Sequence, residues 1–111
     1  MNKRDIAELI RTQNDRFRKT GVGGLEVITP GIKEMGGASV ALVRQMVAAD
    51  NKFDERNDPY QEHDFGSIVF RRQKIFWKID YYDKTLSAGS PNPCDPDVTT
   101  RVLTIMLARE Y

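Results

Sequence analysis

Residues 65–82 read FGSIVFRRQKIFWKIDYY, and this stretch decides the fold. Two runs rich in β-branched and aromatic residues, 65–70 and 74–82, are separated by the short polar segment RRQ, a pattern that predicts a β-hairpin. Side chains alternate in direction along a strand, so the second run has one apolar face and one mixed face. The face predicted to point into the core comprises Ile75, Trp77, Ile79 and Tyr81.

The segments before the hairpin predict two helices and a further strand. Apolar residues recur at helical spacing in residues 3–19 and again from about Ala38 to Asp50. The glycine-rich segment 20–24 ends the first of these helices. Between them, residues 25–29 (LEVIT) are rich in β-formers and predict a short strand that ends before Pro30.

The segment after the hairpin predicts a loop and then a final helix. Residues 83–97 contain a glycine and three prolines among small polar residues, which is typical of a loop. Asp95-Pro96-Asp97 has the pattern of a helix start, with an Asp N-cap followed by proline at the first helical position. The apolar residues of the sequence DVTTRVLTIMLAREY, 97–111, then predict a central, buried helix.

The predicted order is therefore helix, strand, helix, strand, strand, helix. This order favours an α+β fold of two layers, in which a small antiparallel sheet with a β-hairpin packs on the helices. A length of 111 residues fits one domain, residues 1–111.

Composition narrows the classes of function. The chain has 17 basic and 16 acidic residues and a formal net charge of +1, which argues against a strongly electrostatic nucleic-acid binder. A single cysteine excludes an intrachain disulfide and a Cys-rich zinc site. No run of apolar residues has the length of a signal peptide or a membrane span, so we expect a soluble cytoplasmic protein that does not bind membranes.

The sharpest candidate for catalysis lies in residues 57–66, NDPYQEHDFG, which contain the only histidine. His63 lies between Glu62 and Asp64, and a histidine oriented by a carboxylate is the basic layout of acid–base catalysis. Adjacent residues of an extended chain point in opposite directions, so the second carboxylate would come from Asp80 or Asp58. The favoured interpretation is that His63 has a structural role. Asn-Asp-Pro is typical of a turn, and buried polar side chains must find hydrogen-bond partners.

Cofactor and metal sites have weaker support. The spacing of histidine and cysteine matches no zinc motif, so we expect no cofactor. A carboxylate-rich magnesium site formed by Asp58, Asp64 and Asp80 is the remaining alternative.

Two surfaces are candidates for binding. Lys78, Asp80 and Tyr82 share the mixed face of the second hairpin strand, which could bind protein or single-stranded nucleic acid if it is uncovered. The alternative is a solvated face with a cross-strand ion pair. Basic clusters at residues 16–19 and at the hairpin turn could together contact phosphate. The turn cluster comprises Arg71, Arg72 and Lys74.

Several long motifs resemble a family of short bacterial proteins that share a domain of unknown function. They are NDPYQEHDFG (57–66), IFWKIDYYD (75–83), GSPNPCDP (89–96), VTTRVLTIMLAREY (98–111) and the opening segments IRTQNDRFRKT and GGLEVITPGI. The usual form of the family has glycine at the place of Gln61, a glycine in the hairpin turn and alanine at the place of Cys94. The resemblance implies a small standalone bacterial protein, often carried on plasmids or other mobile elements, and no established activity.

These observations favour a small non-enzymatic protein that binds a macromolecule, with a protein as the expected partner and nucleic acid as the less favoured one. The mobile-element association implied by the resemblance suggests an accessory or anti-defence role. The alternative is an acid–base or metal-assisted enzyme centred on His63, with Asp64, Glu62 and Asp80 assisting.

Overall fold

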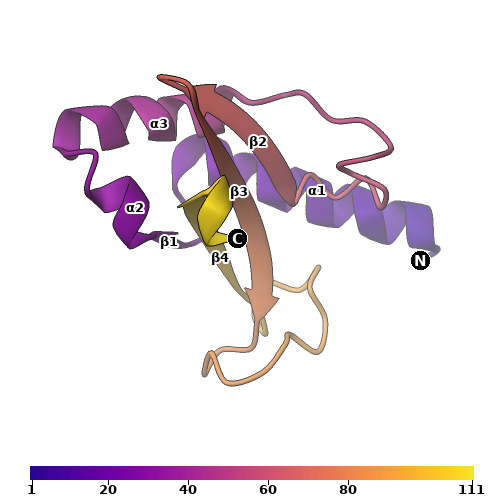
Figure 1. Cartoon of the computed structure of the whole chain (residues 1–111). Helices are drawn as coiled ribbons and strands as arrows, with labels where there is room; N and C mark the ends of the chain where they lie inside the picture. Colours follow the sequence, from indigo (N-terminus) through magenta and orange to yellow (C-terminus); the bar gives the residue numbers. More distant parts are fainter.

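The computed structural model describes all 111 residues and contains four helical segments and four strands (Figure 1). They are α1 (Lys3–Thr20), β1 (Gly24–Ile28), α2 (Pro30–Lys33), α3 (Gly37–Ala49), β2 (Phe65–Phe70), β3 (Gln73–Tyr82), β4 (Thr100–Leu107) and the 3-10 turn η1 (Ala108–Glu110). The predicted α+β class is confirmed. No helix combines the length and the apolar sequence that a bilayer-spanning segment requires.

The four strands form one sheet in the order β1-β4-β3-β2. The predicted hairpin is β2–β3, in which Phe70 pairs with Gln73 across a two-residue turn, and β3 is also antiparallel to β4. In contrast, β1 runs parallel to β4, with Leu25 opposite Val102. The sheet is therefore mixed, and the prediction of an antiparallel sheet was wrong for its β1 edge.

The predicted C-terminal helix is wrong, because residues 100–107 form the central strand β4. Asp97 N–H bonds to the Asp95 carboxylate at 2.9 Å, and Val98 N–H bonds to Asp95 O, so this segment makes a tight turn instead of starting a helix. β-branched residues favour the strand that follows. This strand has apolar residues on both faces, with Ile105 and Leu107 on the core face and Met106 on the other, a pattern that periodicity alone does not separate from a buried helix.

One face of the sheet is covered by the helices and forms the core. Its innermost side chains include Trp77, Ile75, Leu103 and Ile105, with Phe17 from α1 and Val43 from α3. The predicted inward face of β3 is thus confirmed for Ile75, Trp77 and Ile79. In the view of Figure 1, α1 passes behind the strands and η1 lies in front of them. The turn η1 and the C-terminal residue lie over the second face, which we call the open face (Figure 1).

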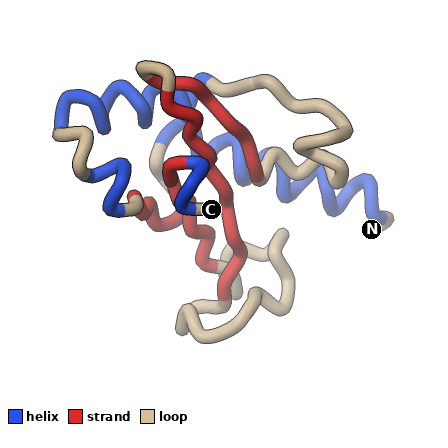
Figure 2. Tube along the Cα trace, in the orientation of Figure 1, coloured by secondary structure: helices blue, strands red, loops and turns tan.

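The two long helices begin and end close to the predicted positions. Asn2 caps α1 through a bond from Asp5 N–H, and Gly21 ends it in the left-handed conformation, with φ 76° and an N–H bond to Phe17 O. Helix α3 starts at Gly37 and ends at Ala49. The short helix α2 was not predicted; it places Ile32 in the core. Two long loops, residues 50–64 and 83–99, connect the elements (Figure 2).

Gly24→Ala is expected to lower the free energy of unfolding by about 2–3 kcal/mol, because overpacking forces backbone shifts. A methyl group at Gly24 would collide with the Arg101 carbonyl and lie 2.7 Å from Cζ of Phe17. At Gly37, a methyl group would meet nothing within 4 Å, so Gly37→Ala should stabilise helix α3 by about 0.5–1 kcal/mol. Urea titration of both variants measures these changes, and equal effects would contradict the β1 packing.

Candidate functional site

The histidine lies in a closed corner of the chain that precedes β2. The buried carboxylate of Asp58 accepts the His63 backbone N–H at 3.0 Å, which folds residues 58–63 into a tight loop. Gln61 and His63 both have positive φ values, 58° and 54°, a conformation that costs energy for residues with a Cβ. The side chain of His63 therefore has a fixed direction.

The His63 ring is held between two carboxylates and an aromatic ring. Its Nδ1 lies 2.9 Å from Oδ1 of Asp15 in helix α1, and its Nε2 lies 3.5 Å from Oδ2 of Asp58. The ring stacks on Phe53 with a centroid distance of 3.8 Å and an interplanar angle of 6°. Both ring nitrogens are thus engaged, and this arrangement connects the corner to α1.

Asp15 connects this corner to a buried arginine in the next turn of α1. The side chain of Arg18 is 1% exposed, contacts Asp15 at 3.3 Å, and donates from Nη1 to the carbonyl oxygens of Val47, Ala48 and Asp50. Those carbonyls lie at the C-terminus of α3, where a cation is favoured. The guanidinium also lies 4.7 Å from the Trp77 ring centroid. We call these contacts the Arg18 clamp.

A second polar network lies next to the first. Asn14 is fully buried, donates from Nδ2 to the Tyr81 hydroxyl at 2.8 Å and to Glu62 O, and accepts from Nε of Arg101. Tyr81 donates its hydroxyl proton to Oε1 of Glu62. Burial raises the pKa of Tyr81 and lowers the pKa of Arg101. These contacts fasten the corner to the sheet.

The four candidate catalytic residues do not meet at one point. His63 contacts Asp15 and Asp58, Glu62 contacts Tyr81, and Asp80 forms an ion pair of 3.0 Å with Lys78 on the open face. No group of three histidine, cysteine, aspartate or glutamate side chains is close enough to hold a metal ion. Asp58, named from sequence as one possible partner of His63, does lie beside it, whereas nothing in the sequence indicated Asp15.

Asp64 is a carboxyl group of this region whose pKa is shifted toward neutral pH. Burial, followed by the nearby Glu62 carboxylate, raises the pKa of Asp64 to about 6. A raised carboxyl pKa means that the folded state binds the proton more tightly than the unfolded state. The resulting stabilisation is complete below the ordinary pKa of 3.8 and is lost as the pH rises through about 6.

Asp64→Asn should therefore be as stable as the wild type at about pH 4, and more stable at about pH 7.5 by on the order of 1 kcal/mol, with solvent screening taken into account. Urea unfolding of both proteins across this pH range measures the difference. A difference that stays constant with pH would contradict the raised pKa.

The open face carries an aromatic cluster, which consists of Phe65, Phe76 and Tyr111. The ring centroids lie 5.2 Å apart for Phe65–Phe76, 5.9 Å for Phe65–Tyr111 and 5.6 Å for Phe76–Tyr111. The Lys74 ammonium lies 5.4 Å from the Phe76 ring centroid. A hollow of about 550 Å³ next to the cluster is lined by Phe65, Lys74 and Tyr111, and on its other sides by Asp54, Arg56, Asn57 and Ser67.

The predicted binding residues lie at different places around this face. Lys78, Asp80 and Tyr82 lie on the open face beside the aromatic cluster, opposite Thr104, Val102 and Thr100 of β4. At the hairpin turn, Arg72 is exposed, but Arg71 donates to the Ser39 hydroxyl and covers Phe70.

The two basic clusters offer fewer free cations than their sequences suggest. Arg18 belongs to the cluster at residues 16–19 and is buried in the clamp. Sequence reasoning also missed Tyr111, which was assigned to the end of a helix. The β-rich composition of residues 98–107 was the available signal that Tyr111 follows a strand.

One comparison with known proteins finds a family of unknown function, and two others find no match. No curated protein and no solved structure matches the chain. Residues 28–110, from the end of β1 to η1, match the family described as "Protein of unknown function (DUF3768)". Because this match spans more than half of the sequence, the chain belongs to the DUF3768 family.

Proposed function

We propose that this chain is a small non-enzymatic protein that binds a protein partner through the open face of its sheet. The observation that carries the proposal is the aromatic cluster, in which Phe65 and Phe76 are half-buried and Tyr111 is exposed, on a face that none of α1–α3 covers. Aromatic side chains are enriched in protein interfaces, and a hollow beside them provides a place for a partner side chain. Tyr111, which is 74% exposed, is available for such a contact.

The charges on this face favour a protein over nucleic acid. The ammonium of Lys78 is neutralised by Asp80 at 3.0 Å, which leaves Lys74 as the cation nearest the aromatic cluster. Phosphate backbones require several uncompensated cations. Apolar side chains extend the surface across the sheet, since Leu25, Val27 and Val69 are 48%, 46% and 63% exposed. A mixed, nearly neutral surface of this kind suits a protein interface.

The biological setting is part of the proposal. Motif resemblance to a family often carried on plasmids supports an accessory or anti-defence role on a mobile element, exercised in the bacterial cytoplasm. A protein with such a role requires a shaped surface and no catalytic residues.

The test compares partner capture by variants of the open face. Tagged wild type, Tyr111→Ala and Lys74→Glu are expressed in the native host, and bound proteins are quantified by mass spectrometry. Leu42→Ala, at a residue of α3 that is 45% exposed, is the matched control. We expect one protein to be recovered with the wild type and the control, and at least about fivefold less of it with the open-face variants. Equal recovery with all four proteins would refute the proposal.

Acid–base catalysis centred on His63, with Asp64, Glu62 and Asp80 assisting, is the second candidate, because the pKa of the Asp64 carboxyl is raised to about 6. Under that hypothesis Asp64→Asn and His63→Ala would abolish the cellular effect, whereas Tyr111→Ala would leave it intact. A folded His63→Ala variant with the full cellular effect excludes it.

A further inference from the structure

The outer edge of β2 exposes unpaired backbone groups. Phe70 and Gln73 flank the two-residue turn and form a hydrogen-bonded pair, as is usual for such a hairpin. Hydrogen-bonded and non-hydrogen-bonded residue pairs alternate along an antiparallel ladder. Counted from Phe70 and Gln73, this alternation makes Asp64 and Ile79 a hydrogen-bonded pair, in agreement with the bond of 2.8 Å from Ile79 N–H to Asp64 O. The backbone N–H and C=O groups of Phe65, Ser67 and Val69 therefore point away from β3, toward the outside of the sheet.

This edge lacks the features that normally prevent pairing with another chain. Its sequence, FGSIVF, contains no charged residue and no proline, and the register with β3 is continuous without a bulge. Proteins usually protect an edge strand with such features. The other edge strand, β1, contains Glu26, which forms an ion pair with Arg44. Only β2 thus combines an apolar sequence with an unprotected edge.

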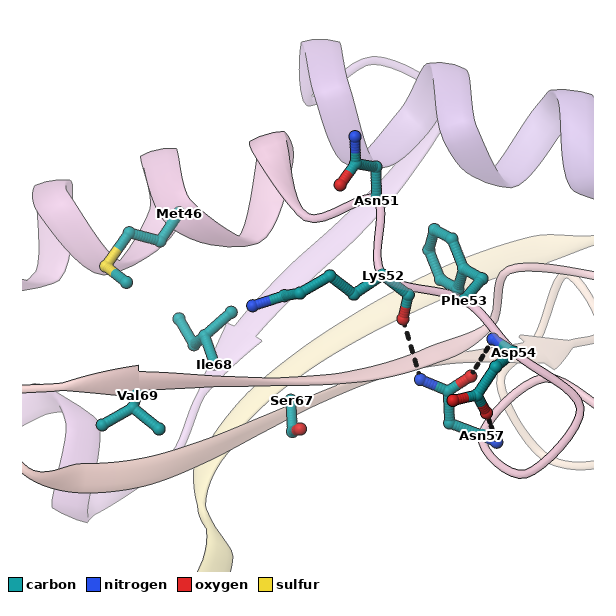
Figure 3. A pocket seen from close by; sticks show the side chains of 9 residues that line it. All are labelled: Met46, Asn51, Lys52, Phe53, Asp54, Asn57, Ser67, Ile68 and Val69. Atoms are coloured by element: carbon teal, nitrogen blue, oxygen red, sulfur yellow. Dashed lines mark hydrogen bonds between the residues drawn. The ribbon is translucent and has the colours of Figure 1, made fainter.

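A groove of about 540 Å³ runs along the same edge. Ser67, Ile68 and Val69 form its floor, and Met46 of α3 and Lys52 of the following loop line its opposite side (Figure 3). The loop is held by its own bonds, in which Asn57 donates to Lys52 O and accepts from Asp54 N–H, both at 2.9 Å. The loop that forms the wall of the groove is therefore held without hydrogen bonds to the β2 backbone.

The groove is lined by one acidic residue, Asp54, which pairs with Arg56 at 3.4 Å, and by one basic residue, Lys52. The side chain of Lys52 extends from the loop toward Met46 and Ile68 in Figure 3. The ammonium belongs to none of the six ion pairs of the chain. A ligand carboxylate in the groove would provide its missing partner. A second copy of this chain would bring another Lys52 and another loop wall to the edge, so repulsion and steric conflict disfavour self-pairing.

We propose that the β2 groove binds an extended segment of the protein partner as an additional strand, with an Asp or Glu of that segment paired to Lys52. Main-chain bonds to Ser67 and Val69 would supply affinity, and alternate side chains of the segment would contact Ile68 and Val69. The inference rests on the proposed function in that it assumes a protein ligand, and it adds the site and the conformation of that ligand.

The test selects displayed random peptides of about ten residues on the wild-type protein. Val69→Pro removes an outward N–H without breaking a bond to β3, and Val69→Thr keeps the N–H as the matched control. Selected peptides should carry alternating apolar residues and an acid, bind Val69→Thr like the wild type, and bind Val69→Pro at least about tenfold more weakly. They should also slow amide exchange at Ser67 and Val69.

Two further measurements do not depend on the folding of Val69→Pro. N-methylation of the peptide amide that bonds to β2 should abolish binding. Lys52→Glu should weaken binding about tenfold, and exchange of the peptide acid for lysine should restore it. No enriched peptide, or peptides insensitive to all three changes, would overturn the inference, as would a dimer of the wild type that Val69→Pro converts to a monomer. A natural partner that depends on Tyr111 but not on Val69 would overturn it and leave the proposed function standing.

Discussion

Arg18→Ala is expected to lower the free energy of unfolding by about 3–5 kcal/mol, the range measured when one member of a buried ionic network is removed. Three carbonyl oxygens at the end of α3 would lose their donor, and Asp15 would lose its cation. The guanidinium also fills the space beside the Trp77 ring. Urea unfolding followed by tryptophan fluorescence measures the loss.

Matched controls separate the clamp from the loss of a positive charge. Arg16→Ala removes an exposed arginine two residues away on the same helix, and should change the free energy of unfolding by less than about 0.5 kcal/mol. Arg18→Lys keeps the charge but lacks the planar guanidinium group with its several N–H donors, and should still lower the free energy of unfolding by about 2 kcal/mol. Equal stability of Arg16→Ala and Arg18→Ala would show that the clamp does not hold α1 to α3.

The β2–β3 hairpin was predicted correctly from the sequence and strand β4 was not, for a physical reason. Residues 65–82 alternate between apolar and mixed positions, because one face of β3 is covered and the other is open. In residues 100–107 burial alternates up to Ile105 and then stops, because Leu107 points into the core and Met106, on the open face opposite Phe76, is also buried. Burial on both faces of β4 depends on what packs against the two faces of the sheet, which no local sequence pattern reports.

The polar corner shows the same limit at the level of single residues. The sequence predicted that His63 lies near carboxylates and that residues 57–59 form a turn. Its closest partner, Asp15, lies 48 residues earlier, on a helix face that also carries Asn14 and Arg18. A polar pattern on an amphipathic helix is read as solvent-exposed unless the fold is known. Arg18 consequently looked like part of a surface cluster although it lies in the core.

Trp77 connects the core to the proposed peptide groove, and its removal is the second change with a large expected effect. The side chain is fully buried and donates from Nε1 to Oδ2 of Asp50 at 2.9 Å. The other oxygen of that carboxylate accepts the N–H of Lys52 at 3.1 Å, where the wall of the groove begins. Trp77→Ala should lower the free energy of unfolding by about 3–5 kcal/mol.

Trp77→Phe separates packing from the hydrogen bond, since it keeps an aromatic ring but leaves Oδ2 of Asp50 without its donor. It should cost about 1–3 kcal/mol and should also weaken binding of the selected peptides, because the start of the Lys52 loop is no longer held. Asp50→Asn, with the amide oxygen toward Trp77, keeps the acceptor of the indole N–H but turns its amide nitrogen toward the Lys52 N–H, so it tests the loss of the Lys52 bond with the Trp77 bond retained. If Trp77→Phe is destabilised but binds the peptides as tightly as the wild type, the Asp50 bond stabilises the core without positioning Lys52.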